Sequence, residues 1–117
     1  MNATILAQRG YAPTAAPLKS ARRSEYEVIA RITSRLRSAI EDKDFSKLIH
    51  AMYENQKLWR KLAIDVADPE NLLPDELRAR IIYLAEFTEH HSRKVIRREA
   101  SAVPLVEVNT AILRGLK

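Results

Sequence analysis

The sequence is poor in the residues on which several classes of site depend. The chain has 117 residues, no cysteine and only two glycines. Disulfides, thiolate metal sites and thiol catalysis are therefore excluded, and phosphate-binding loops and nucleophile elbows need more glycine than this. No apolar run approaches the ~20 residues of a membrane span or begins the chain as a secretory signal. We expect one cytoplasmic domain that is not an enzyme and has no cofactor.

The excess of positive charge lies at the start of the chain. The formal charge is +5, but residues 1–23 hold four basic and no acidic residues, while the other 94 residues hold 16 basic and 15 acidic. Gly10, Pro13 and Pro17 interrupt this segment, which predicts a flexible basic N-terminal arm with at most a short helix near residues 3–8. The nearly neutral remainder offers little charge for nucleic acid.

Beyond the arm, apolar residues recur every three or four positions, which is the period of an amphipathic helix. Ser24 and Glu27 form a capping box, Asp44 can cap a second helix, and Pro74 suits the first turn of a third. No segment alternates with the period of a strand. The pattern predicts an all-α fold, a four-helix antiparallel bundle within residues 24–117. The expected helices cover residues 24–41, 44–67, 74–99 and 105–116.

The third expected helix has an unusually wide apolar face. At ~100° per residue its apolar positions span an arc of roughly 220°, more than one seam of a bundle requires. This face must be covered on two sides, by neighbouring helices or by a partner. Its apolar residues are Leu77, Ile81, Ile82, Leu84, Ala85, Phe87, Val95 and Ile96.

The same helix contains the sequence EFTEHHSRKVIRRE, in which two histidines stand next to acidic residues. His90 and His91 lie about 100° apart around a helix, so they do not share one site. A helical zinc pair needs i, i+4 spacing, and a di-iron bundle needs Glu-x-x-His, whereas Glu89 stands three positions after Glu86. We expect no metal site. His90 belongs to the polar side, and His91 belongs to the apolar arc.

Four cations close this helix, and two interpretations of them stay open. Arg93, Lys94, Arg97 and Arg98 have the sign that stabilises the negative end of the helix dipole. They could instead contact a nucleic acid or an acidic partner. Nucleic-acid binding would suit a translational regulator of messenger RNA, but no aromatic residues are interleaved with these cations for stacking on bases.

Polar residues also interrupt otherwise apolar helix faces at Asn55, Gln56, His91 and Asn109. An unpartnered buried amide costs on the order of 1–3 kcal/mol, so these groups either bond to one another or line a groove for another chain.

Three stretches of the chain resemble the FlaF family of alphaproteobacterial flagellar proteins. They are ENQKLW (54–59), DVADPENLLPDELRARIIYLAEFTEHHS (65–92) and PLVEVNTAILRGL (104–116), and the resemblance extends over residues 25–116. The positions best marked by the family are Asn55, Leu58, Trp59, Asp65, Asn71, Pro74, Leu77, Arg78, Phe87, His91, Asn109 and Gly115.

The resemblance implies a small regulatory or chaperone protein that binds flagellin in the cytoplasm before export and promotes flagellin synthesis. It also implies action alongside the translational regulator FlbT, with FlbT or export components as further partners. Because the terminal segments of flagellin are amphipathic, we expect helix-in-groove recognition. The alternative is a nucleic-acid-binding translational regulator of flagellin mRNA.

The predicted groove combines apolar and polar residues from three helices. Ile5 and Leu6 of the arm are expected to occupy it when it is empty. Its predicted borders are Asn55, Trp59, Tyr83, Phe87, His91, Val108, Asn109 and Ile112.

Overall fold

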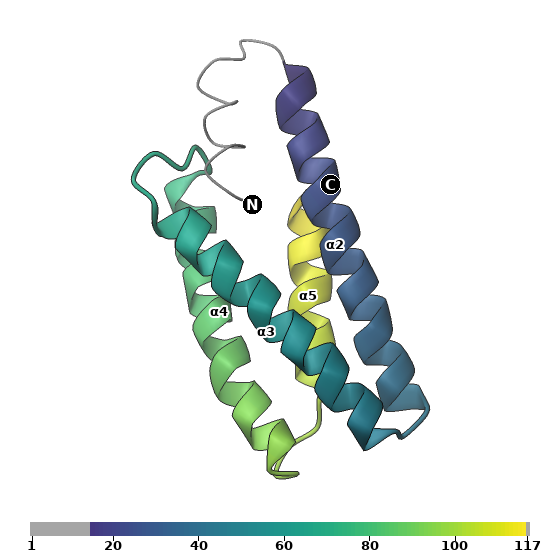
Figure 1. Ribbon diagram of the computed structural model, residues 1–117. Coiled ribbons are helices and arrows are strands. Elements are labelled where there is room, and N and C mark those ends of the chain that lie inside the picture. The colour runs from purple at the N-terminus through teal and green to yellow at the C-terminus, as the bar shows by residue number, and fades with distance from the viewer. Residues whose placement is uncertain (1–14, 117) are drawn as a thin grey trace.

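The computed structural model describes residues 15–116, with side chains over residues 23–115. The helices are α2 (Ala15–Glu41), α3 (Phe45–Ala67), α4 (Asp75–Ile96) and α5 (Val103–Leu116). They run alternately in opposite directions (Figure 1), and no strand occurs among the described residues. The predicted all-α, antiparallel four-helix architecture is therefore confirmed.

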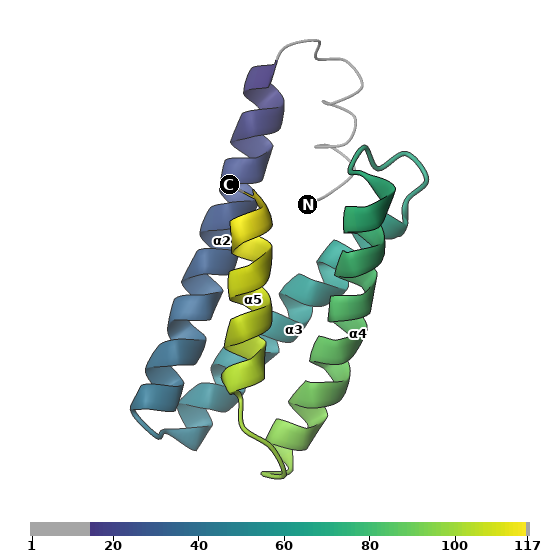
Figure 2. The same ribbon diagram turned by 180° about the vertical axis from the view of Figure 1, so that it is seen from behind.

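The helices pack around the bundle in chain order. α3 crosses between α2 and α4 on one side, and α5 lies along α2 on the other side, as the opposite views of Figures 1 and 2 show. α4 packs extensively on α3 but touches α5 over a much smaller area. The edge between α4 and α5 is therefore the least closed seam of the bundle.

The first helix begins nine residues earlier than the capping box at Ser24 predicts. α2 starts at Ala15, so part of the expected arm is helical and the capping box lies inside the helix. The segment AAPLKSARR is rich in alanine, leucine, lysine and arginine, and Pro17 falls in the first turn, where it removes no intrahelical hydrogen bond. Residues 1–14, including the expected helix near 3–8 and both Ile5 and Leu6, lie outside the described residues.

The other helix boundaries are within three residues of their predicted positions. Asp44 caps α3 as predicted, because its side chain accepts a hydrogen bond from the Lys47 amide at 3.0 Å. α4 ends at Ile96 rather than Glu99, because Arg98 adopts a left-handed conformation with φ 62° and the Glu99 amide turns back to the Lys94 carbonyl. This is the usual geometry of a helix C-terminus.

Side chains tie the connection between α3 and α4 to the end of α3. The Arg78 guanidinium donates to the Val66 carbonyl at 2.9 Å and to the Asp68 carbonyl at 3.0 Å. Asn71 donates from its side chain to the Asp65 carbonyl at 3.0 Å. These bonds satisfy carbonyls that the end of a helix leaves without partners, and they fix the direction in which α4 departs.

Two separate apolar clusters fill the interior of the bundle. One lies towards the end that carries the α3–α4 connection, and its buried members are Ile29, Trp59, Leu62, Val66, Leu73, Ile81 and Ile112. The other lies towards the end that carries the α2–α3 turn, and its buried members are Leu36, Ala51, Met52, Val95, Ala102 and Leu105.

A polar layer separates the two clusters, and Asn109 of α5 is its centre. The Asn109 carboxamide accepts a hydrogen bond from Trp59 Nε1 at 2.8 Å. It donates to Asn55 Oδ1 at 2.9 Å and to Thr33 Oγ1 at 3.1 Å, and Thr33 donates to the Ile29 carbonyl. These side chains are at most 1% exposed. One carboxamide therefore links α2, α3 and α5, as expected if the polar residues bond to one another.

α4 faces the same interior with hydroxyl groups that take no part in this network. Thr88 and Ser92 are buried between Ile81 and Val95 along α4. Their hydroxyl oxygens, and the Nδ2 atom of Asn55, have no hydrogen-bond partner among the described residues. α4 is consequently joined to the bundle centre by apolar contact rather than by hydrogen bonds.

We predict that Asn109→Leu destabilises the protein by about 2 kcal/mol or more, although the two side chains are similar in size. The leucine would leave Trp59 Nε1 and Asn55 Oδ1 buried without partners. Urea denaturation followed by circular dichroism measures the change, and Glu107→Gln, at an exposed site on the same helix, is the control. A variant as stable as the wild type would show that the polar layer does not stabilise the fold.

Candidate functional site

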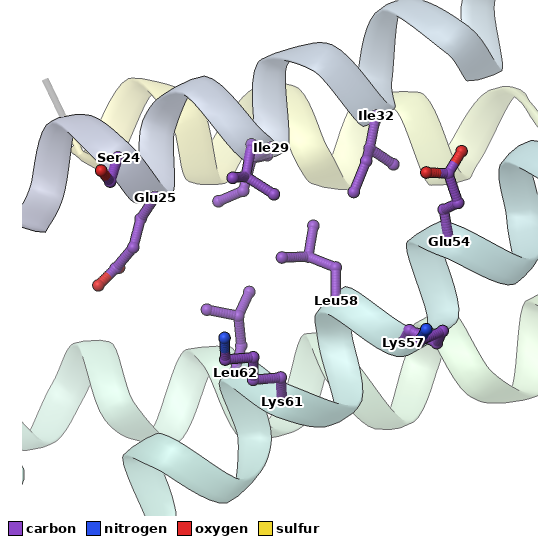
Figure 3. Close-up of a pocket in the computed structure, with 10 residues that line it drawn as sticks. Ser24, Glu25, Ile29, Ile32, Glu54, Lys57, Leu58, Lys61 and Leu62 are labelled. Carbon is purple, nitrogen blue, oxygen red and sulfur yellow. The ribbon is translucent and has the colours of Figure 1, made fainter. Parts of the chain in front are cut away.

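A groove with an apolar floor lies between α2 and α3 (Figure 3). It encloses about 370 Å³ and lies on the side of the apolar cluster that contains Ile29 and Leu62. Its volume is at the lower end of the ~300–1,000 Å³ typical of ligand pockets. The lining residues are Ser24, Glu25, Val28, Ile29, Ile32, Glu54, Lys57, Leu58, Lys61 and Leu62.

The groove exists because α2 and α3 diverge. The two helices meet at the turn around Lys43 and separate towards the other end of the bundle (Figure 1). Ile29 and Leu62 form part of the buried floor, whereas Val28 and Leu58 are half-buried at its opening. Among the described residues, the apolar side chains that stay partly exposed in the groove are therefore Val28 and Leu58, above a floor that is buried.

Four of the predicted partner-binding residues lie in the interior instead of bordering a groove. Asn55, Trp59 and Asn109 belong to the polar layer, and Ile112 is buried in the first apolar cluster. Trp59 and Ile112 lie on the apolar faces of α3 and α5, which the neighbouring helices cover, and Asn55 and Asn109 bond to each other within that covered interior. Contact of these four with a partner stays a prediction, and it would require the bundle to open.

Three of the other predicted residues form a stripe of rings along α4. Tyr83, Phe87 and His91 follow one another at four-residue spacing, so they share one side of the helix. Tyr83 is 68% exposed. Phe87 and His91 are half-buried and stack, with ring centroids 5.3 Å apart.

His91 and Val108, the last two of the predicted partner-binding residues to be placed, also make contacts within the chain. His91 Nε2 lies 2.8 Å from the carbonyl oxygen of Ser101, in the connection between α4 and α5. Val108 is half-buried and packs against the first apolar cluster. The ring of His91 thus interacts with the protein's own chain, while the outer part of the stripe stays accessible.

The basic cluster at the end of α4 is largely engaged within the chain. Arg93 lies 3.8 Å from Glu89, Arg97 lies 3.2 Å from Glu99, and the Arg98 guanidinium stands 4.0 Å over the ring of Phe45. Lys94 is exposed. Because these contacts hold three of the four cations, the arrangement favours the interpretation as a stabilised helix end over that of a phosphate-binding surface.

A second hollow of about 330 Å³ lies at the opposite end of the bundle from the groove. The α2–α3 turn, the end of α4 and the connection to α5 surround it, and Phe45 and Arg98 are among its lining residues. Because it lies between helix ends, it offers no long apolar floor for a partner helix.

Sequence patterns identified part of the groove but not the groove itself. Ile29, Ile32 and Leu62 are among the apolar residues that recur at helical spacing in the sequence, and Leu58 is one of the positions marked by the family resemblance. Val28, Lys57 and Lys61 carried no separate signal, because helical periodicity does not reveal how far two helices diverge.

The fold and its groove define a small antiparallel four-helix protein with a partly exposed apolar groove between two of its helices. The family model described as Flagellar protein FlaF matches residues 7–116, so the chain belongs to the FlaF family and is a flagellar protein. No curated protein and no solved structure matches the chain. None of the helices within residues 15–116 is long and apolar enough to cross a membrane.

An ion pair joins the outer surfaces of α3 and α4. Arg60 donates to both carboxylate oxygens of Glu89, at 3.0 and 2.9 Å. These hydrogen bonds hold the pKa of the Glu89 carboxyl below its usual value, and partial burial opposes them. The pair therefore stabilises the fold only while Glu89 is ionised.

We predict that Glu89→Gln lowers the urea midpoint slightly at pH 7, and that this difference disappears in acid. The folded-state pKa of Glu89 is depressed, so its contribution is present above the unfolded pKa of about 4.3 and is lost as pH falls through the folded value. Denaturation at pH 7 and pH 3 compares the variants with Glu89 ionised and with a larger fraction of it protonated. The control is Glu86→Gln, at an exposed carboxylate on the same helix. An equal effect of Glu89→Gln at both pH values would contradict the prediction.

Proposed function

We propose that this protein binds flagellin in the cytoplasm as a chaperone and so promotes flagellin synthesis and export. Two lines of reasoning support the proposal. Membership of the FlaF family makes the chain a flagellar protein, and the family resemblance implies flagellin as the partner. A chaperone for an amphipathic protein needs apolar surface that it can cover and release.

The observation that carries the proposal is the apolar groove between α2 and α3. Its floor is made of branched aliphatic side chains from two helices, and its opening is flanked by polar residues. This is the arrangement in which an amphipathic helix inserts its apolar face into a hydrophobic groove. We therefore place the flagellin-binding surface at this groove, with Leu58 at its opening.

The ring stripe on α4 is the alternative surface for the same partner. Tyr83 and Phe87 present aromatic area next to the open seam between α4 and α5, and aromatic residues often dominate the energy of protein interfaces. The two surfaces lie on different helices, so substitutions separate them. Loss of binding through Tyr83→Ala, with Leu58 intact, would move the site to α4.

We predict that Leu58→Asp abolishes the binding of cognate flagellin, measured by isothermal titration calorimetry with purified proteins. A carboxylate at the opening of the groove would lose its hydration when an apolar helix docked. Ile64→Asp is the matched control, because Ile64 stands on the same helix but is 72% exposed and does not line the groove.

Folding of both variants must be checked first by thermal denaturation, because Leu58 packs against the apolar cluster. If Leu58→Asp unfolds the protein, Leu58→Ala replaces it, with a smaller expected loss of affinity. A wild-type protein that does not bind flagellin, or that co-purifies only with FlbT or an export component, would contradict the proposed function.

A further inference from the structure

We infer that the groove selects amphipathic helices with a particular charge pattern. The preferred helix carries apolar residues one turn apart and, on the flank beside α3, carboxylates one turn apart that pair with Lys57 and Lys61. This inference rests on the proposed function, and it specifies which helical segment of a partner the groove accepts.

The apolar floor sets the length of the contact. The lining positions on α3 extend from Glu54 to Leu62, which corresponds to about 12 Å at ~1.5 Å per residue. Two turns of a partner helix fit this length. The partner therefore inserts two or three apolar side chains at i, i+3 and i+4 or i+7 spacing, towards Ile29, Ile32 and Leu58 (Figure 3).

The two basic charges at the opening of the groove have no ion-pair partner among the described residues. The Glu54 carboxylate is held by Arg35, whose Nη1 atom lies 2.7 and 2.6 Å from its two oxygens. Glu25 is buried and already interacts within the chain. Lys57 and Lys61 are exposed, and neither forms an ion pair with a carboxylate of the described residues.

The positions of the two lysines define the spacing of the partner's charges. Lys57 and Lys61 are separated by one helical turn, with ~5–6 Å between their Cβ atoms. The Lys57 ammonium lies 5.4 Å from the ring centroid of Tyr53, which keeps this side chain along α3. Carboxylates at i and i+4 on the flank of a docked helix therefore match both ammonium groups, and lysines there would be repelled.

A nucleic acid is a poorer match for the same surface. Binding of single strands combines a continuous basic track with aromatic rings that stack on bases. The groove offers two lysines and an aliphatic floor, and none of the described residues that line it is aromatic. The apolar floor and the basic flank of the groove together favour an amphipathic helix that carries acidic residues beside its apolar face.

The test uses the full chain and two synthetic helical peptides. Both peptides carry leucines at i, i+3 and i+7, and they differ only in glutamate or lysine at two flanking positions four residues apart. We expect the wild type to bind the glutamate peptide about tenfold more tightly than the lysine peptide, which two exposed ion pairs can supply. Added salt should reduce this preference.

We expect Lys57→Glu/Lys61→Glu to reverse the preference between the two peptides. The control is Lys94→Glu/Arg114→Glu, which makes the same change in net charge at exposed sites outside the groove and should keep the preference. Leu58→Asp should bind neither peptide, because both peptides insert their leucines into the same apolar groove. Equal affinity of the wild type for both peptides would overturn the inference. An unchanged preference in the lysine variant would also overturn it.

Experiments with flagellin separate this inference from the proposed function. If flagellin binds the wild type and Lys57→Glu/Lys61→Glu equally well, the charge rule is wrong and the proposed function stands. If flagellin does not bind but the peptides show the expected preference, the proposed function is wrong and the groove rule holds for another helix. A leader RNA that binds through the two lysines, with no preference between the peptides, overturns the inference.

Discussion

The hydrogen bonds of Asn109 set the register of the helices. Its side chain stands at the level where α2, α3 and α5 meet, and it uses both ends of the amide to bind side chains on two other helices. A shift of α5 by one turn would leave a buried amide and an indole N–H without partners. Amphipathic helices can slide along apolar contacts at little cost, but these bonds permit one alignment.

The groove depends on this alignment. With α5 fixed against α2 through Thr33, and α3 joined to α5 through Asn55 and Trp59, the apolar cluster around Leu62 is packed by these helices, and a groove remains beside it between α2 and α3. The connection held by Arg78 and Asn71 then sends α4 back along the other side of α3. As a result, α4 packs mainly on α3 and α5 packs mainly on α2, and neither helix covers the groove.

Much of this architecture could be predicted from the sequence, because it depends on local patterns. Periodicity identified four helices, Asp44 was recognised as a cap, and Asn55 and Asn109 were expected to bond to each other if they did not line a groove. The start of α2 was missed because the capping box at Ser24 is a strong local signal, and the helical preference of the preceding residues outweighs it.

The groove was harder to predict because it is a property of two helices. Which residues of α2 and α3 stay uncovered depends on the angle between the helices, and no single helix contains that information. The same limit explains why Trp59 and Ile112 were predicted at a partner surface. An apolar helix face indicates that the helix is covered, but it does not distinguish the protein's own helices from those of a partner.

The polar layer also has a consequence for release of a bound chain. A protein that shields amphipathic helices risks exchanging one of its own helices for a foreign one, since both offer the same kind of apolar stripe. A foreign helix in place of α5 would need an amide at the position of Asn109, or it would leave Asn55 Oδ1 and Trp59 Nε1 without partners. In the proposed chaperone role, this requirement disfavours the exchange of α5, so that a bound helix stays at the surface and can dissociate without unfolding the protein that holds it.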